Sequence, residues 1–184
     1  TSDRRVMLDL GHILQPNWGH KLVSNDVEVV SNEEIRGTFR TQGWAHFHSV
    51  SYRILFSEPA DSIRMFTDGK ETPASVPSKI HSDKDLKYHF KFPASDKPLL
   101  VKVALSPVDP DGAVKNMESE LPEWDFDATV AQSEQVWNEA LNRVSMTSSD
   151  PVVMKNFYTA LYHSMIAPFA YQDVDGRYLG MDKQ

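Results

Sequence analysis

The spacing of apolar residues changes once along this chain, and that change constrains the fold more than any other feature. Up to about Ser106, short runs rich in Val, Ile, Phe, Tyr and Thr alternate with polar or Gly/Pro clusters. From about Phe126, apolar residues recur at helical spacing instead. Strands followed by helices predict two layers or two domains, because alternating βαβ units would mix the two periods along the chain.

The first part of the chain has the pattern of an antiparallel β-structure. In the segment LKYHFKF (86–92), the four apolar residues fall on one side and the Lys and His residues on the other. One buried face and one wet face are typical of a β-sandwich. Turn-forming clusters separate the strands at SEPAD, TDGKETPASVP and PASDKP. The expected strands are 6–14, 27–30, 35–41, 46–56, 62–66, 86–92 and 99–105.

Two helices are predicted in the last third of the chain. The first covers residues 126–144, and Asp125 or Asp127 offers its N-cap carboxylate. The second follows Asp150, a second capping residue, and has Pro151 at its first position, where the missing N–H costs nothing. Its apolar stripe comprises Val153, Phe157, Leu161 and Met165, and Pro168 is expected to end it.

These patterns predict a mainly β protein with a C-terminal α part. We expect a β-sandwich domain over residues 1–107, a linker over 108–123 and a helical segment over 124–184. The linker carries the start of an acidic run, five acids between Glu118 and Asp127, which is typical of a solvated face. A structural domain whose helices pack on its own sheet is an alternative.

The composition is that of an ordinary soluble globular protein, with 40% hydrophobic and 24% charged residues. The 19 Lys plus Arg against 26 Asp plus Glu give a formal net charge of -7, so nucleic acid is not an expected partner. No apolar run approaches the roughly 18 residues that cross a bilayer. The absence of cysteine excludes thiol catalysis and cysteine-ligated zinc within these residues, and it fits a cytosol or a bacterial periplasm.

Charged and aromatic residues near the end of the chain form the strongest candidate site. They follow a predicted helix in a short loop that also contains Gly176 and Gly180, and such loops often carry function. DVDG (173–176) also opens like a calcium loop, in which oxygen ligands stand two residues apart. A glycine turn with solvated Asp side chains is the alternative that the sequence favours. The candidate residues are Asp173, Asp175, Arg177, Tyr178 and Asp182, the last of which stands where a calcium loop has a bidentate Glu.

Histidines provide two weaker candidates. His163 and Ser164 are adjacent on a helix and point about 100° apart, so they cannot form a base–nucleophile pair. We expect His163 to lie in an interdomain seam. His46 and His48 share an expected strand face with Trp44, but no third metal ligand stands near them, which favours an exposed polar face.

Trp18, in QPNWGH, is a candidate of another kind. An indole exposed in this turn would stack on a sugar ring, and packing within a hairpin is the alternative. A noncatalytic β-sandwich module that binds carbohydrate through Trp18 or Trp44 is therefore a second functional hypothesis. An interaction module of the same fold belongs to the same class.

Four stretches also carry a resemblance to a known family. They are GAVKNMESE (112–120), FDATVAQSEQVWNEALNRVSM (126–146), KNFYTALYHSMIAP (155–168) and DVDGRYLGMD (173–182). In this order and at this spacing they resemble glycoside hydrolase family 92, the calcium-dependent exo-acting α-mannosidases. The resemblance implies a β-sandwich followed by an (α/α)6 barrel that carries most of the active site. Only the opening helices of that barrel are expected in this chain, and the sandwich is expected to lack its opening segment.

The resemblance also implies an activity. It would be inverting hydrolysis of α-mannosides in mannose-rich glycans, with calcium as cofactor and the remainder of the barrel as structural partner. The general acid, the general base and the calcium ligands of the family lie beyond Gln184, so no residue here takes those roles and the isolated chain is expected to be inactive. Members of the family are commonly exported by bacteria, which implies the periplasm, the cell surface or secretion.

Overall fold

The computed structural model describes residues 3–167 and 170–180. The chain divides into two compact units, one formed by Thr1–Trp124 with Gln172–Gln184 and the other by Asp125–Tyr171. The chain therefore leaves the first unit after Trp124, forms the second unit, and returns to the first at Gln172. Within the described residues, no helix has the length and apolar character needed to cross a membrane.

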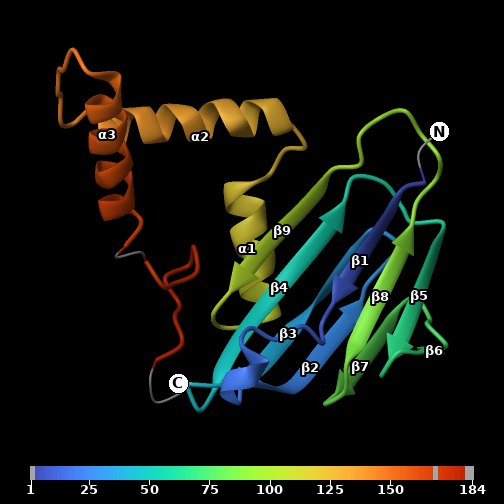
Figure 1. Cartoon of the computed structure of the whole chain (residues 1–184). Helices are drawn as coiled ribbons and strands as arrows, with labels where there is room; N and C mark the ends of the chain where they lie inside the picture. The colour runs from blue at the N-terminus through green and yellow to red at the C-terminus, as the bar shows by residue number, and fades with distance from the viewer. Residues whose placement is uncertain (1–2, 168–169, 181–184) are drawn as a thin grey trace. The chain divides into compact units, whose positions relative to one another are not determined.

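The strands of the first unit form two antiparallel sheets that face each other, which confirms the predicted β-sandwich (Figure 1). The four-stranded sheet has the order β1 (Arg5–Asp9), β8 (Leu86–Lys91), β5 (Ser62–Thr67) and β6 (Lys70–Thr72). The five-stranded sheet has the order β7 (Ser78–Ser82), β2 (Lys21–Val29), β3 (Glu34–Gln42), β4 (His48–Phe56) and β9 (Val101–Ser106). A short 3-10 helix, η1 (Pro16–Trp18), lies between β1 and β2.

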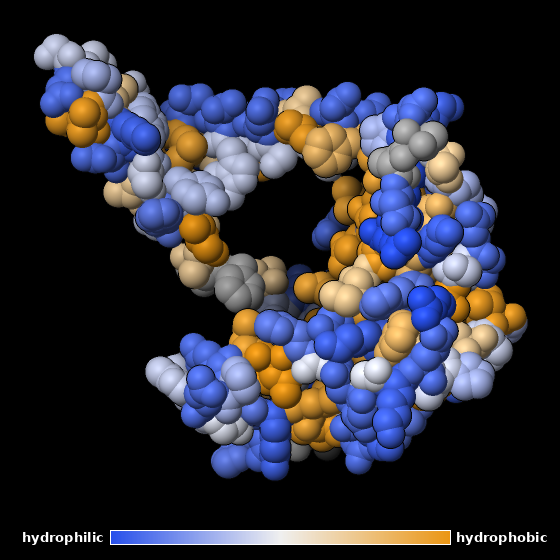
Figure 2. Space-filling model, turned by 45° about the vertical axis from the view of Figure 1, so that its right-hand side comes forward, coloured by the Kyte–Doolittle hydropathy of each residue, from blue (hydrophilic) through white to orange (hydrophobic). Residues whose placement is uncertain are grey.

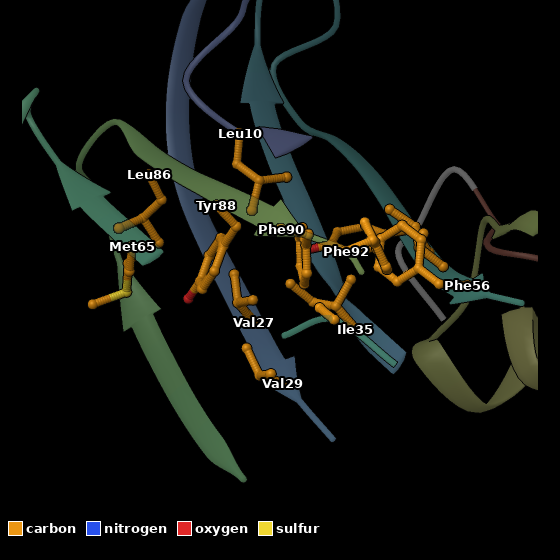
Figure 3. Packing of buried hydrophobic residues seen from close by; sticks show 13 residues of the cluster. Leu10, Val27, Val29, Ile35, Phe56, Met65, Leu86, Tyr88, Phe90 and Phe92 are labelled. Carbon is orange, nitrogen blue, oxygen red and sulfur yellow. The ribbon is translucent and has the colours of Figure 1, made fainter. Parts of the chain in front are cut away.

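The hydrophobic core lies between the two sheets, where alternate residues of each strand point inward (Figure 3). On β8, Leu86, Tyr88 and Phe90 are each 1% exposed, so the apolar side of LKYHFKF is the buried side, as predicted. Ile35 and Phe56 belong to the facing sheet, and the ring of Phe56 lies 4.8 Å from that of Phe90. Fully burying one such side chain stabilises the fold by roughly 1.5–3 kcal/mol.

Strand β9, at one edge of the five-stranded sheet, exposes its apolar residues. The register pairs Leu105 with Tyr52 and Val103 with Ile54, so these residues share the face that β4 turns toward the core. Val103 and Leu105 are nevertheless 53% and 59% exposed. The described part of the four-stranded sheet therefore does not cover β9. Figure 2 shows further hydrophobic residues, coloured orange, as patches on a mostly hydrophilic surface.

The expected linker contains a helix that the sequence analysis does not predict. Helix α1 (Pro110–Glu120) packs against β9 and β4 (Figure 1). It buries Ala113 and Met117, which are 0% and 2% exposed. The acids of the run 118–127 remain exposed, in agreement with the expected solvated face.

The second unit consists of α2 (Phe126–Leu141) and α3 (Pro151–Met165). Asp125 and Asp150 cap these helices as predicted, each accepting a hydrogen bond of 2.8 Å from a backbone N–H of the first turn. Trp137 of α2 and Tyr162 of α3 pack with ring centroids 4.6 Å apart. Neither helix contains a buried residue. Pro168, the expected end of the second helix, lies outside the described residues.

Three details of the strand prediction are wrong. β6 lies inside TDGKETPASVP and β7 directly follows it, whereas the sequence analysis predicts only a turn there. β1 ends at Asp9, because the Asp9 carboxylate accepts the N–H groups of Gly11 and His12 and turns the chain. Trp44 and His46 lie in a bend before β4, so they do not share a strand face with His48.

Candidate functional site

A buried carboxylate ties the loop of residues 172–180 to the sandwich. Asp173 is 1% exposed, and its two oxygens accept hydrogen bonds from Ser106 Oγ and Asn116 Nδ2, both at 2.8 Å. Ser106 ends β9 and Asn116 lies in α1, so three segments that are distant in sequence meet at this side chain. A buried carboxylate needs such donors, because burial without them costs several kcal/mol.

The surroundings of Asp173 are fixed by backbone groups. Ser106 Oγ accepts the N–H groups of Val108 at 3.0 Å and Asp109 at 3.2 Å. The hydroxyl hydrogen of Ser106 is therefore donated to Asp173. Gly112 allows this approach, because a Cβ at that position would overlap the side chains of Asp173 and Ser106.

Asn116 connects the same three segments through its amide group. Besides Asp173, its Nδ2 donates to the carbonyl of Leu105 at 2.8 Å. Its Oδ1 accepts the backbone N–H of Val174 at 2.9 Å. Both ends of this amide therefore have partners, and the side chain is held in one orientation.

Arg177 forms a second tie between the loop and α1. Its guanidinium donates to Asp109 at 2.6 and 3.2 Å and to Asp175 at 3.0 Å. Asp109 is also the N-cap of α1 and accepts the N–H of Gly112 at 2.6 Å. Lys115 of α1 donates to Asp175 at 2.7 Å. We call the following set the Asp173 latch: Ser106, Asp109, Asn116, Asp173 and Arg177.

Basic partners lower the pKa of two carboxyl groups in this region. The hydrogen bond from Arg177 is the main reason that the pKa of Asp109 lies below its ordinary value of 3.8. The hydrogen bond from Lys115 is the main reason that the pKa of Asp175 falls to about 2. In return, Asp109 and then Asp175 raise the pKa of Arg177. Asp109 and Asp175 are therefore ionised at neutral pH, where neither can act as a general acid.

The residues of this region do not fit a calcium site. Asp173 and Asp175 are occupied by N–H and O–H donors. Gly176, with φ 82°, forms a turn in which its N–H donates to the carbonyl of Asp173 at 2.8 Å. In residues 3–167 and 170–180, no group of three or more His, Asp or Glu residues could hold a metal ion. The geometry agrees with the glycine-turn alternative for DVDG, although its Asp side chains are hydrogen-bonded rather than solvated.

The other predicted site residues do not join the Asp173 latch. Tyr178 is 64% exposed, and its side chain has no hydrogen bond or ion pair in the described part of the chain. His163 is exposed on α3, in the second unit, with its ring 5.7 Å from that of Tyr162. Ser164 Oγ donates to a carbonyl of its own helix at 2.7 Å, in agreement with the exclusion of a Ser–His pair. Asp182 lies outside the described residues.

Sequence reasoning identified Asp173, Asp175 and Arg177 but missed their partners Ser106, Asp109 and Asn116. Asn116 lies in the expected linker, where no helix is predicted, and Ser106 is the residue after the expected strand 99–105, so neither was a candidate. The signal that would have found α1 is Asp109 followed by Pro110, a capping residue and a proline at the first helical position. Asp150 followed by Pro151 is the same signal, and it begins α3 as predicted.

Matches to known families agree with this organisation. Residues 1–106 match the N-terminal domain of glycosyl hydrolase family 92, and residues 112–184 match the catalytic domain of that family. The two domain models of one family therefore match along the chain in the same order as the β-sandwich and the helical part. The chain belongs to glycoside hydrolase family 92, which confirms the resemblance seen in the sequence.

Solved structures of the family cover nearly the whole chain. An α-mannosidase from Bacteroides thetaiotaomicron matches 99% of it with a TM-score of 0.88 and 26% identity. An inverting mannosidase from the same organism matches 97% with a TM-score of 0.76 and 17% identity, which shows the shared fold. The chain spans 24% of the length of each.

A curated relative from the fungus Arthroderma benhamiae is described as an uncharacterized secreted glycosidase. It is 36% identical over 74 residues, which are 38% of this chain and 10% of the relative. The relatives of this chain are therefore much longer glycoside hydrolases.

Proposed function

We propose that this chain is part of an inverting, calcium-dependent exo-α-mannosidase that hydrolyses mannose-rich glycans. The observation that carries the proposal is the match of both family domains, in order, along one chain. The α-mannosidase that is 26% identical was also solved in complex with mannoimidazole, and the relative with 17% identity is described as inverting. Because the chain spans 24% of these proteins, the proposal concerns the activity of the whole protein.

In this proposal the described residues have a structural role and do not carry out the chemistry. Helix α1 precedes the α2–α3 segment, and the loop of residues 172–180 follows it. Asp173 binds both α1 and the end of β9, so the latch joins the chain that follows the helical segment to the chain that precedes it. Its carboxylates are occupied in doing so, and we therefore expect the 184-residue chain to be inactive.

The catalytic groups are expected in the remainder of an (α/α)6 barrel, outside this chain. Inversion requires a carboxylic acid that protonates the leaving oxygen and a carboxylate that activates water on the opposite face of the sugar ring. Such groups stand roughly 6.5–9.5 Å apart, which leaves room for the water. Calcium would bind oxygen ligands from the protein and from the hydroxyl groups of the sugar. We expect its protein ligands to lie outside the described residues, because those residues do not fit it.

Export to the periplasm or the cell surface is a further part of the proposal. It is supported by the description of the fungal relative as secreted. Fractionation of cells that express the whole protein tests it, and accumulation in the cytoplasm would contradict it.

Mannose release from α-linked manno-oligosaccharides tests the proposed activity. The whole protein should release single mannose units, a calcium chelator should abolish release, and added calcium should restore it. Proton NMR during the first minutes should show the β-anomer of mannose, since inversion at an α-linkage gives the β-product. The 184-residue chain should release none.

Each part of the proposal has its own contradicting result. The α-anomer as first product would contradict inversion, and full activity in chelator would contradict the calcium requirement. Mannose release by the 184-residue chain would place the catalytic carboxylates within these residues. A whole protein that cleaves no α-mannoside would contradict the proposal as a whole.

A further inference from the structure

Two indole side chains lie together on the surface of the sandwich. Trp18 ends η1, Trp44 lies in the bend between β3 and β4, and their ring centroids are 5.6 Å apart. They remain 63% and 78% exposed, so their contact leaves most of both side chains open to solvent. Exposing this much adjacent apolar surface is unfavourable in water and is typical of surfaces that bind a ligand or a partner.

A pocket of about 460 Å³ adjoins this pair and uses Trp44 as part of its wall. That volume lies within the range of roughly 300–1,000 Å³ that small-molecule sites occupy. His20, also in the wall, meets the ring of Trp44 edge-on at 6.1 Å and an interplanar angle of 81°. The lining residues are His12, Ile13, Leu14, Gln15, His20, Phe39, Thr41, Gln42, Gly43, Trp44, Ala45 and His48.

The polar side chains of this pocket are available to a ligand. In the described part of the chain, the side chains of Gln15, Gln42 and His48 make no hydrogen bond or ion pair. An amide group offers both a donor and an acceptor, and so does an imidazole ring in its neutral form. Buried Nε2 of His20 also has no partner among the described residues, and a ligand hydroxyl that reached it would supply one.

The chemistry of the lining selects a neutral, polyhydroxylated ring. The lining contains no Asp, Glu, Lys or Arg, so it offers no fixed charge to a phosphate, a carboxylate or an amine. A hexopyranose has an apolar C–H face, which stacks on an indole, and a rim of hydroxyl groups, which pair with side chains that both donate and accept. Aromatic surface next to uncharged amide groups matches both parts of such a ring.

We propose that the pocket beside Trp44 binds a neutral hexopyranose, specifically a mannosyl unit of the glycan. Trp44 is the stacking platform, Trp18 supports and extends it, and Gln42 and His48 bind hydroxyl groups. The hexopyranose class follows from the lining of the pocket, whereas the choice of mannose rests on the proposed function. The inference adds a binding site on the sandwich to a protein whose catalytic groups are expected on further chain.

Titration of the 184-residue chain with methyl α-D-mannopyranoside and with an α-linked mannobiose tests the proposal, with amide chemical shifts as the readout. Saturable shifts are expected at residues around Trp44, with millimolar affinity for the monosaccharide. Trp44→Ala should weaken binding about tenfold and Trp18→Ala about threefold, since each removes part of the stacking surface. Trp124→Ala is the matched control, because Trp124 is a half-exposed indole that contacts Lys102 elsewhere on the unit.

If Trp44→Ala fails to fold, Trp44→Phe tests the same position, and it should retain part of the affinity.

Two results would overturn the proposal. One is the absence of saturable shifts with the mannosides and with the matching glucoside and galactoside. The other is binding that the Trp44 variants leave at wild-type strength. Hydrolysis plays no part in this titration, so failure of the proposed mannosidase activity in the whole protein would be a separate result.

Discussion

Asp173 holds a carboxylate where solvent does not reach it, and two donors from different segments surround that group. Asn116 and Ser106 are each fixed by further backbone contacts, so neither is free to turn away. Asp173 is therefore one of the contacts that hold the loop, beside those that Arg177 and Lys115 make. A substitution of Asp173 that keeps the size of its side chain and removes its charge therefore tests this contact.

Asp173→Asn should release the loop while preserving its shape. Ser106 Oγ already accepts two N–H groups, and Asn116 Nδ2 is a donor, so either orientation of the new amide directs a donor at a donor. We expect a loss of about 1–3 kcal/mol of unfolding free energy and faster hydrogen exchange at the N–H of Val174. Denaturation and exchange measurements test this. Glu120→Gln, at an exposed position of α1, should change neither quantity, and wild-type exchange in Asp173→Asn would show that the latch does not hold the loop.

The ion pairs of Arg177 should make the latch sensitive to acid. The folded-state pKa values of Asp109 and Asp175 lie below 3.8, that of Asp175 at about 2, so folding favours their ionised forms. The stabilisation is complete above about pH 5 and is lost as the pH falls through 4 toward 2. Arg177→Gln should reduce this pH dependence, chiefly the part that comes from Asp109, because Lys115 remains the main partner of Asp175; the urea midpoint at several pH values measures it. An unchanged curve below pH 5 would contradict the assignment.

At the scale of elements, α1 connects several parts of the first unit, because it packs against β9 and β4 and its Asn116 binds the loop of residues 172–180. Met117 is 2% exposed against β9 and β4, so Met117→Ala would leave a cavity under the helix. We expect a loss of about 2–5 kcal/mol in unfolding free energy of the first unit. Val130→Ala on α2 is the matched control, since Val130 is 41% exposed and its replacement should change stability little. Equal midpoints for the two variants would show that α1 is not packed as described.

The sequence predicted elements whose local pattern agrees with their environment. β8 was clear, because one of its faces is apolar and the other polar, and α2 and α3 were clear from their caps and spacing. β6 and β7 were missed because they are short and lie beside Gly and Pro residues. α1 was missed because only one of its four buried residues, Met117, is large and apolar, so it lacks a broad apolar stripe.

The candidate site was predicted in part for a related reason. Clustered charges marked Asp173, Asp175 and Arg177, since these stand close together in the sequence. Their partners Ser106 and Asn116 are 67 and 57 residues away from Asp173, and nothing in the local pattern of either residue indicates the contact. Long-range hydrogen bonds depend on the folded topology, which a one-dimensional pattern does not contain.

At the scale of the whole molecule, the two units differ in how they are stabilised. The sandwich has a buried core between its sheets, whereas α2 and α3 contain no buried residue. Most helices in proteins are stabilised by burying an apolar face, and short helices are marginal without it. The α2–α3 pair therefore needs a covering surface, and in the proposed function the remainder of the barrel supplies it.

Dye binding tests whether the apolar surface of the helical pair is covered in the whole protein. Phe126, Val152 and Ile166 are 66%, 61% and 50% exposed, so the 184-residue chain should bind a hydrophobic dye such as anilinonaphthalene sulfonate. The fluorescence per mole should be several-fold lower in the whole protein, because barrel helices would cover this face. Val152→Asn with Ile166→Asn should reduce dye binding by the short chain, while Val76→Asn, at an exposed apolar residue of the first unit, should not. Equal fluorescence from the short chain and the whole protein would contradict the proposed cover, since the same apolar surface would then face solvent in both.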